Sequence, residues 1–544
     1  MAVITVNKFS GVSPMTPPRY LGNEAAQTAL NCPVWKGSLQ PIKGAQALTP
    51  SPLTKSGNIK SIYRFDQSQT NELNYWFHWT TDVDVVQGFI AGDTTERTYY
   101  TGDGNPKVTN ATMALTGGGN LYPIASYDIG VPKPTGTFTT AKTGTANANT
   151  TAETRVYTFT YVNSFGEEST PYAETDMSPS TEDVYPGESV VVTMPTGTIN
   201  NVNVTKKRIY RSASGTANTS YFFVAEVTLA TATYTDSLDG DDLNEELPSL
   251  TWVQPPTTLK GLVGMPNGVM AGFSGNDVYF SEPFRPFAWP TQYVQTVGYP
   301  VVGLGVIDTT VVVLTKGRPY FIQGSHPDSS VMVEADVNQA CISKRSIVSM
   351  NNNVFFASPD GIVALSPGGS SVVTQSLFDK ETWQAQSPDD LVACMYESQY
   401  VGFFDTTSGN GGFVYDMKQK TWNFHNVYVT GAYNDLKNDA LYIIQNNELS
   451  KWDSGNDLSY TWKSKKFTFL EPKSFACYRV QAEAYPVTMK IYRDSSAVVN
   501  LSVTDDALRR LPPGLGTDWE FQLEGDKEVY NVQLAQTPQE LNQG

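Results

Sequence analysis

Residues 268–283 read GVMAGFSGNDVYFSEP, which is an apolar strand, a turn rich in Gly, Asn and Asp, and a second apolar strand. Four later stretches repeat this order, and they are TVVVLTKGRPYFIQG (310–324), NNVFFASPDGIVALSPG (352–368), YVGFFDTTSGNGGFVYDMKQKTWNF (400–424) and ALYIIQNNELSKWDSG (440–455). Their starts lie about 40 to 50 residues apart, a period that is typical of β-propeller blades. We therefore predict a β-propeller of six or seven blades. A general β-meander or a second β-sandwich stays open as an alternative, because the repeat carries no strict WD or kelch signature.

The composition also favours strands. Aromatic residues make up 12% of the 544 residues and charged residues only 17%, which is low for a surface that must stay solvated. Tyr, Phe, Thr and Val suit half-buried pleated surfaces, and the 43 Gly and 33 Pro supply turns. We expect an all-β chain of roughly three or four domains.

Sequence segments with this strand–turn–strand pattern lie on both sides of a long segment that lacks it. Residues 59–130 and 255–457 both consist of short β runs separated by turn clusters, so we assign the propeller blades to these two segments. Residues 131–254 form a separate module between them. Residues 458–544 alternate cleanly between apolar and polar positions and predict a C-terminal β-sandwich, and residues 1–58 form an N-terminal arm.

The interruption, residues 131–254, reads as an immunoglobulin-like β-sandwich. In VYTFTYVNSFGEESTP, which starts at Val156, alternation predicts that Tyr157, Phe159 and Tyr161 lie on one face of a strand. The runs TYVNSFGEESTPY, RIYRS, FVAEV and TYTDSL together resemble a fibronectin type III domain of the kind inserted in bacteriophage virion proteins.

The arm, residues 1–58, is rich in proline, which removes backbone donors and fixes φ, so we expect it to be irregular with little core of its own. Residues 19–31 have room for one or two helical turns. Such an arm either reaches across to another subunit or lies as a strap on its own chain. Under the first interpretation, the assembly interface includes Met15, Pro17, Pro18, Arg19 and Tyr20.

The charge balance argues against tight nucleic-acid binding. The chain has 54 acidic and 37 basic residues, a net charge of −17, whereas affinity for phosphate backbones comes from clustered Lys and Arg. An acidic wall still allows DNA to slide past without sticking. Residues 131–254 hold 7 basic and 15 acidic residues, so this module carries −8 of the total and is expected to face solvent or a basic partner.

Catalytic motifs are missing from the sequence. It has no HExxH, and GFSGN at 272–276 has the wrong spacing for a nucleophile elbow. GGGN at 117–120 lacks the Lys and Ser or Thr of a phosphate loop. Of the three histidines, we expect His78 (in WFHW) to be a satisfied core ring. We predict no enzyme, no cofactor and no metal site.

The densest run of acids predicts a solvated turn at the exit of the insertion. It lacks the twelve-residue ligand pattern of a calcium loop. Its members are Asp236, Asp239, Asp241, Asp242, Glu245 and Glu246.

Compartment signals are few. Cys32, Cys341, Cys394 and Cys477 are far apart and form no CxxC, so we expect buried free thiols in a reducing cytoplasm. The N-terminus does not read as a secretory signal, and no apolar stretch reaches the length of a membrane span. These features predict a soluble protein made in the cytoplasm.

Both ends of the chain resemble one family. Residues 11–44, GVSPMTPPRYLGNEAAQTALNCPVWKGSLQPIKG, look like the start of tail nozzle (tail tubular B-like) proteins of short-tailed bacteriophages. The C-terminal segments WKSKKFTF, YRVQAEAY, VTMKIYRD and RRLPPGLGTDWEFQLEGDKEVYNVQLAQTPQEL, within residues 462–541, look like the final sandwich of the same proteins. The sharp motifs span about 120 residues, and the insertion departs from the simplest members.

The resemblance implies a structural role in the virion tail. In that family several copies, usually six, form a ring below the portal and adaptor proteins, the genome leaves through the ring, and fibres or spikes attach to its flanks. From the resemblance we expect a homo-oligomeric ring of six copies, in that family's pattern, assembled in the host cytoplasm. Two other functions stay open: a host-recognition protein that binds surface glycan, and a glycan-degrading enzyme whose pair of carboxylates the sequence does not single out.

Overall fold

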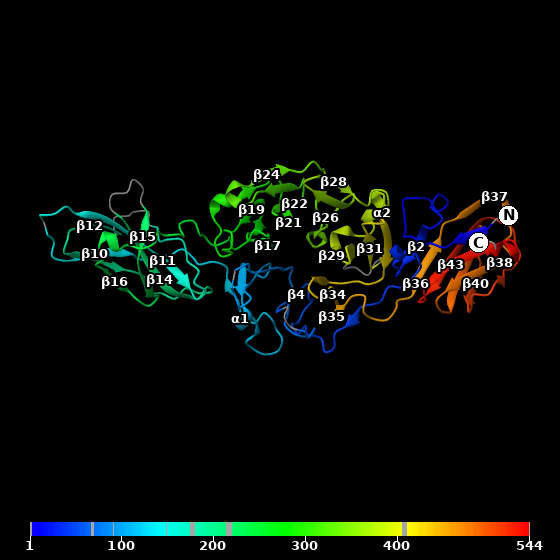
Figure 1. Ribbon diagram of the computed structural model, residues 1–544, viewed down its shortest axis with the longest axis horizontal. Coiled ribbons are helices and arrows are strands. Elements are labelled where there is room, and N and C mark those ends of the chain that lie inside the picture. The colour runs from blue at the N-terminus through cyan, green and yellow to red at the C-terminus, as the bar shows by residue number, and fades with distance from the viewer. Residues whose placement is uncertain are drawn as a thin grey trace.

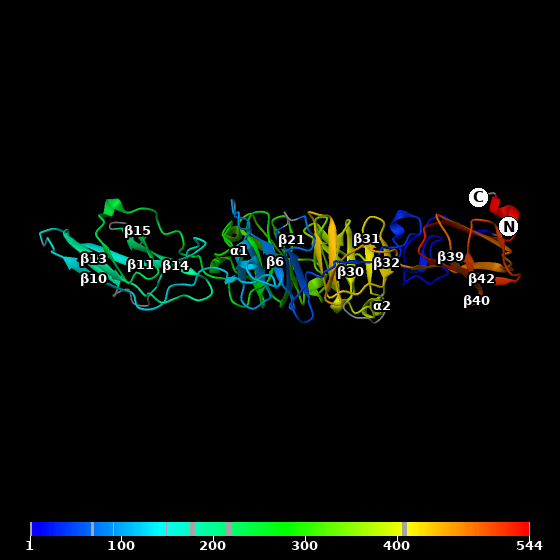
Figure 2. The same ribbon diagram turned by 90° about the horizontal axis from the view of Figure 1, so that it is seen from below.

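The computed structural model describes residues 3–66, 70–90, 92–147, 149–173, 180–213, 220–404 and 411–542. These residues are nearly all β, and the α-helices among them, α1 (Ala111–Leu115) and α2 (Lys380–Gln384), have five residues each. None of the described helices has the length and apolar character needed to cross a membrane. The turn at 405–410, in the fourth repeat, lies outside the described residues. The molecule is elongated, with many small sheets grouped in three parts (Figure 1 and Figure 2).

Seven antiparallel sheets make up the middle part of the described chain, and we call them together the ring. Their strands are β4 (Ser61–Arg64) and β5 (Trp76–Trp79); β6 (Asp84–Gln87), β7 (Thr98–Thr101), β8 (Lys107–Thr109) and β9 (Tyr127–Asp128); β17 (Lys260–Gly264), β18 (Met270–Ser274), β19 (Asp277–Phe280) and β20 (Gln295–Thr296); β21 (Val301–Ile307), β22 (Thr310–Thr315), β23 (Tyr320–Gln323) and β24 (Val331–Glu334); β25 (Val348–Met350), β26 (Asn353–Ser358), β27 (Gly361–Ser366) and β28 (Gly369–Val372); β29 (Val392–Tyr396), β30 (Gln399–Phe403), β31 (Gly412–Asp416) and β32 (Thr421–His425); β33 (Gly431–Asp435), β34 (Ala440–Gln445), β35 (Glu448–Lys451) and β3 (Gln46–Ala47).

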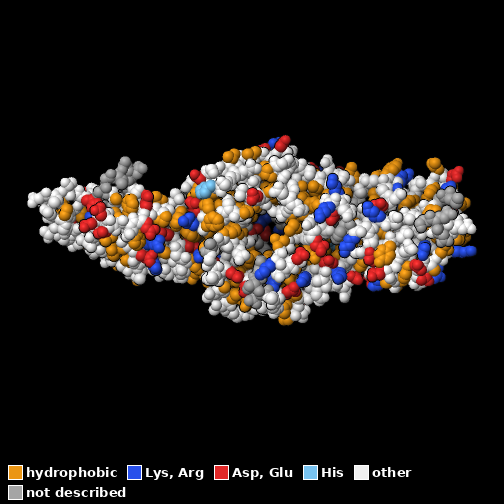
Figure 3. All heavy atoms as spheres, in the orientation of Figure 1, with side chains coloured by type: hydrophobic (Ala, Val, Ile, Leu, Met, Phe, Trp, Pro, Cys, Tyr) orange, Lys and Arg blue, Asp and Glu red, His pale blue; other side chains and the backbone are white. Residues whose placement is uncertain are grey.

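The sheets contact one another in a closed order. First strands meet in the series β6, β17, β21, β25, β29, β33 and β4. The circle closes between the β4–β5 sheet and the β6–β9 sheet, where the rings of Trp79 and Tyr100 lie 5.3 Å apart. Figure 1 shows the sheets around a common centre, and Figure 3 shows a hollow there.

Strand β22 shows why the sheets stack side by side. Its apolar run leaves neither face polar: Val311 and Val313 pack with the preceding sheet, while Val312 and Leu314 pack with the following one. Each of these four side chains is fully buried. A continuous apolar run of this length is typical of a strand covered on both faces. The repeated stretches found in the sequence supply such strands to neighbouring sheets.

Chain segments far apart in sequence close the ring. Strand β3 pairs with β35, although about 400 residues separate them. Arg64 of β4 forms an ion pair of 2.9 Å with Asp435 of β33, and both side chains are buried. The ring of Trp76 meets that of Tyr442 edge-on at 4.8 Å. The first strands after the arm are therefore fastened to the last sheet of the ring.

The insertion holds two packed sheets. One sheet has the order β10 (Thr139–Gly144), β13 (Glu188–Thr193), β16 (Thr233–Asp236), and the other has the order β12 (Thr181–Val184), β11 (Glu153–Asn163), β14 (Val204–Ser212), β15 (Tyr221–Thr228). Tyr157, Phe159 and Tyr161 of β11 all lie in the core between these sheets, which confirms that they share one face. Figure 1 places this part at one end of the molecule.

The strands from Tyr460 onward, together with β1, form the part at the opposite end, again as two layers over one core. One layer has the order β1 (Val3–Val6), β43 (Val529–Ala535), β38 (Cys477–Ala482), β41 (Arg509–Arg510). The other layer has the order β36 (Tyr460–Ser464), β42 (Gly516–Gly525), β39 (Val487–Arg493), β40 (Ser496–Val503), with β37 (Phe467–Lys473) also pairing with β42.

The N-terminal arm is irregular over most of its length, as expected, but it contains short strands and its apolar side chains enter cores shared with other parts of the chain. Besides β1 and β3 it contains β2 (Ala26–Leu30), so the helical turns expected within residues 19–31 are also absent from this stretch. Strand β2 lies between β32 and β36. Its pairing with both strands joins a ring sheet and a C-terminal layer into one ten-stranded sheet. Partners on both edges of β2 outweigh its local helical preference.

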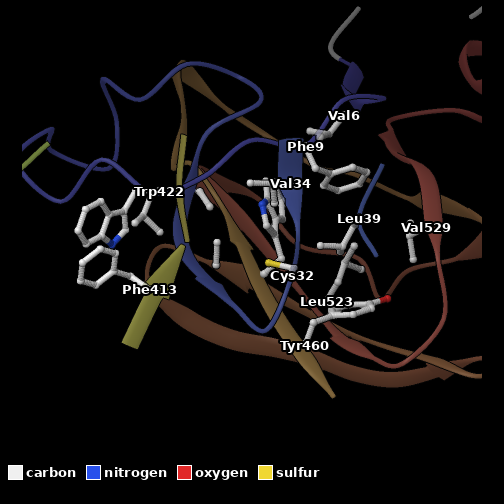
Figure 4. Close-up of a cluster of buried hydrophobic side chains, with 14 of the residues drawn as sticks. Val6, Phe9, Cys32, Val34, Leu39, Phe413, Trp422, Tyr460, Leu523 and Val529 are labelled. Carbon is white, nitrogen blue, oxygen red and sulfur yellow. The ribbon is translucent and has the colours of Figure 1, made fainter. Parts of the chain in front are cut away.

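The arm also supplies core side chains, so over much of its length it is a strap on its own chain. Phe9, Cys32, Val34 and Leu39 are buried and belong to the same cluster as Trp462. Figure 4 shows arm side chains directed into the space between the neighbouring sheets.

Candidate assembly surface

The segment predicted for assembly lies on the surface. Met15 is 55% exposed and Tyr20 is 75% exposed, although both are large and partly apolar. Pro17, Pro18 and Arg19 between them are exposed as well. The structure therefore brings the five predicted residues together in one exposed loop, which we call the arm loop (residues 13–20).

The arm loop is fixed at several points. The amide of Met15 donates to the carbonyl of Leu377 at 2.9 Å, and the carbonyl of Pro18 accepts from the amide of Lys466 at 3.0 Å. These two partners lie in different parts of the fold, one after the ring sheet β25–β28 and one just before β37. Two adjacent prolines further restrict φ. A loop held in this way loses little conformational entropy when a partner binds it.

The side chains of the arm loop suit a protein contact. Buried centres of protein interfaces are enriched in Tyr, Met and Arg and depleted in other charged residues. Residues 13–20, SPMTPPRY, contain one charge, on Arg19. The loop is therefore able to bury Met15 and Tyr20 against another protein without leaving several charges unpaired.

The hollow at the centre of the ring is small, and ion pairs of Lys344 with two aspartates span it. Its volume is about 200 Å³. The Lys344 ammonium lies 2.9 Å from a carboxylate oxygen of Asp82 and 2.7 Å from one of Asp84. Burial disfavours its charge, but the two carboxylates hold the pKa of Lys344 above its ordinary value. Because Lys344 precedes β25 and the two acids lie at β6, this ion pair connects sheets on opposite sides of the ring.

A larger cleft lies where the arm, the ring and the C-terminal part meet. Its volume is about 700 Å³. Its lining is mostly polar and includes Gln40, Lys43, Tyr396, Gln399, Asp453 and Glu528. Burial raises the pKa of Asp453, and the neighbouring Lys43 opposes that change. The mixture of carboxylates, amides and one tyrosine is capable of hydrogen bonding to a polar ligand.

His78 is a buried core ring, as predicted. Its Nε2 accepts from the amides of Thr54 (3.1 Å) and Lys55 (3.0 Å), so Nδ1 carries the proton and donates to the carbonyl of Trp76 at 3.0 Å. Burial lowers the pKa of His78 to about 4, which keeps the ring neutral. The ring has no free nitrogen for a metal or a substrate.

The other two histidines have different surroundings from His78. His425 is fully buried, and burial lowers its pKa to about 3. His326 accepts from the amide of Asp328 at 3.2 Å and so caps a short 3₁₀ helix. In the described part of the chain, the hydrogen-bond partners of both rings are backbone groups and not nucleophilic side chains.

The acidic run of the insertion needs one correction. Asp236 is buried instead of solvated: its carboxylate accepts from Tyr157 at 2.7 Å and pairs with the buried Arg211 at 2.8 Å. The other members are exposed as predicted, and they are Asp239, Asp241, Asp242, Glu245 and Glu246.

The described part of the chain contains neither a group of metal ligands nor a disulfide. Within it, His, Cys, Asp and Glu form no group of three or more able to hold a metal ion. The four cysteines are free thiols, and all but the half-buried Cys394 are buried.

Comparisons with known proteins show no family. No protein-family model matches the chain, and no curated protein matches it. Among solved structures the chain is similar to BamB from Moraxella catarrhalis, with 14% identity over 53% of this chain and 90% of that one and a TM-score of 0.26. It is also similar to PorZ of Porphyromonas gingivalis, with 10% identity over 89% and 82% of the two chains and a TM-score of 0.25. Neither likeness is close enough to indicate what this chain does.

Sequence reasoning missed two other exposed apolar surfaces. In β24, Val331 is 61% and Val333 is 49% exposed, and hydrophobic side chains gather at this margin of the ring in Figure 3. Leu470 and Leu515 protrude from the C-terminal part. Proline-rich text drew attention to the arm loop, whereas alternating strands gave no sign that these positions would lie on the surface.

Proposed function

We propose that the ring is a seven-bladed β-propeller, interrupted by a fibronectin type III-like insertion and followed by a C-terminal β-sandwich. The closed order of contacts among seven sheets supports this proposal. So does the pairing of β3 with β35, because a strand from near the chain's beginning then completes the last blade. Radial repetition leaves only short strand edges, which suits a rigid scaffold.

We further propose that the chain is a structural subunit of a short phage tail that assembles with copies of itself into a nozzle ring, of six copies in the pattern of the family it resembles. The observation that carries this proposal is the arm loop, a rigidly held exposed surface with the residue types of a permanent contact. The resemblance of residues 11–44 to tail nozzle proteins includes this loop.

The partners follow from the same proposal. Portal and adaptor proteins lie above the oligomeric nozzle, and fibres or spikes attach to its flanks. DNA passes through the nozzle without specific binding, in keeping with a net charge of −17 on each chain. The Lys344–Asp82 and Lys344–Asp84 ion pairs span the central hollow of about 200 Å³, so the centre of one propeller is blocked to a DNA duplex. The genome therefore passes between subunits and not through the centre of one propeller.

Mass photometry and electron microscopy of the purified chain, alone and with its adaptor, test the assembly. We expect closed rings of several copies. Tyr20→Asp in the arm loop should reduce ring formation, while Leu436→Asp, at a position 72% exposed in the turn after β33, serves as the matched control. A chain that stays monomeric in the presence of the adaptor refutes the proposal, as does equal assembly by the two variants.

The cleft of about 700 Å³ favours a second candidate, binding of host-surface glycan. Its amides, carboxylates and Tyr396 match the groups that hydrogen-bond and stack with sugars. Adsorption of the full chain to host cells, lost in Tyr396→Ala, would support it, and turnover of a glycan by the full chain would indicate an enzyme instead. Failure of both leaves the structural role as the better proposal.

A further inference from the structure

Away from its two connecting segments, the insertion touches the ring through the short loop Asn163–Glu168 and through the carbonyl of Asn201, which accepts from the amide of Asp128 at 2.8 Å. Phe165 at its tip enters the ring, where the Arg97 guanidinium lies over the Phe165 ring at 5.2 Å and the Tyr127 ring lies 6.0 Å away. The amide of Ser164 donates to Asn203 within the insertion, so the loop is supported from behind. The contact depends on few side chains, which makes each of them important for the position of the insertion.

Next to Phe165, Glu167 is a buried acid that contacts the ring. It is 3% exposed, and one carboxylate oxygen lies 3.3 Å from Nη1 of Arg97. The other oxygen accepts from Nδ2 of Asn163 at 2.8 Å. Among the described residues, the only cationic partner of the Glu167 carboxylate is therefore Arg97, which belongs to the ring.

The adjacent acid, Glu168, makes a useful contrast. It is equally buried, but its partners belong to the insertion itself: Arg208 at 2.9 Å and the hydroxyl of Tyr210 at 2.7 Å. Two neighbouring carboxyl groups therefore serve different purposes. Glu168 stabilises the insertion, and Glu167 faces the ring.

The ring side keeps its own charge balanced. Arg97 also pairs with Asp93 through Nε at 3.3 Å, and its amide donates to the same carboxylate at 2.9 Å. The titratable groups that face Glu167 are Arg97, Asp93 and Tyr99, and burial raises the pKa of Tyr99. Because Asp93 remains paired with Arg97, a neutral Glu167 leaves no cation without a partner.

We propose that Glu167, Phe165 and Arg97 form a proton-dependent latch that holds the insertion against the ring. When the latch opens, the insertion moves on the two short segments that join it to the ring, around Gly130 and around the exposed Leu250. Gly130 marks the first connection with φ of +82°, a conformation that costs glycine little. The latch goes beyond the proposed function and does not depend on it.

The direction of the pH effect follows from burial. Burial raises the pKa of Glu167 from 4.5 to about 7, against the opposing effects of Asn163 and Arg97. Opening the latch returns the carboxyl group to water, where its pKa falls back toward the ordinary value. The closed form thus holds the proton more tightly, so closure is strongest below about pH 4.5, weakens as the pH rises to about 7, and is constant above. The change in the closing equilibrium is at most about 300-fold.

Hydrogen exchange of the full chain, measured between pH 5 and pH 8.5, tests the latch. Protection of the 163–168 amides is compared with that of β26 and β27 in the same sample, which corrects for the intrinsic effect of pH. We expect the relative protection of this loop to fall as the pH rises in the wild type. Small-angle scattering should show a broader range of particle dimensions at pH 8.5 than at pH 5.

Variants separate the latch from general stability. Glu167→Gln mimics the protonated acid, so the loop should stay protected at every pH, whereas Arg97→Gln should lower its protection chiefly at high pH, where the charged Glu167 has lost its cation. Glu168→Gln is the matched control and should leave the pH dependence of the wild type. Protection of the wild-type loop that does not change with pH overturns the proposal, and so does a wild-type pH dependence in Glu167→Gln.

Discussion

Replacing Arg64 with methionine should weaken the closure of the ring. Arg64 and Asp435 are 1% and 0% exposed and 2.9 Å apart, so the variant leaves a carboxylate buried without its cation. Loss of one partner of a buried pair costs about 3–5 kcal/mol of unfolding free energy. For a ring of this size the change corresponds to a melting temperature lower by roughly 10 °C. Scanning calorimetry of the full chain measures it.

An exposed ion pair between the same two sheets provides the control. Lys451 and Glu72 lie 2.7 Å apart, but each is about one-third exposed, so Lys451→Met should cost about 0–1 kcal/mol. The double variant Arg64→Met with Asp435→Leu should regain much of the lost stability, because no charge is then left buried. Equal melting temperatures for Arg64→Met and Lys451→Met would show that this reasoning is wrong.

Trp519 is 2% exposed, so Trp519→Ala should lower the unfolding free energy of the C-terminal part by about 3–5 kcal/mol in a urea titration, and a change near zero would contradict its burial. His78 and His425 have pKa values of about 4 and about 3 in the folded chain, below the unfolded value of 6.5, so the folded chain binds fewer protons. Their contribution is present above pH 6.5 and is lost as the pH falls toward 4, about 3 kcal/mol for each ring, and a melting temperature constant over this interval would refute it. Met15→Asp should leave the melting temperature unchanged yet reduce self-association in sedimentation velocity, in parallel with Tyr20→Asp, and unaltered sedimentation would exclude the arm loop from the contact.

The strands of the ring could be predicted because their pairing is local. In residues 268–283 two apolar runs flank Gly275 and Asn276, and the structure pairs them as β18 and β19. The run at Val311 pairs with β23 across a similarly short turn. In such hairpins the sequence contains both partners and the turn between them, so period and turn residues suffice.

The arm could not be predicted because its partners are remote. Local text at 26–30, AQTAL, favours a helix, and nothing near it indicates that β32 and β36 would lie on its two edges. The same difficulty applies to Asp236, which reads as part of an exposed acidic run. Only the fold shows that Arg211 and Tyr157 reach it.

The candidate site was predictable in part. Prolines around Met15 and Tyr20 indicated a surface segment, and both residues are exposed. The latch was not predictable, since Arg97 and Glu167 belong to different parts of the fold and neither sits in a recognisable motif. Their meeting depends on how the insertion leans against the ring, which no local pattern records.

The pairing of the two chain ends has a consequence for synthesis. Val3 is opposite Ala535 in the β1–β43 pair, so β1 must wait for a strand that is synthesised about 530 residues later. At about 5–20 residues per second, that delay is roughly 30–100 s. Throughout this time β1 lacks its partner, and β2 lacks its neighbours until β32 and β36 emerge, so both present bare strand edges to other nascent chains. A message truncated before β43 would therefore yield a product in which β1 has no partner strand.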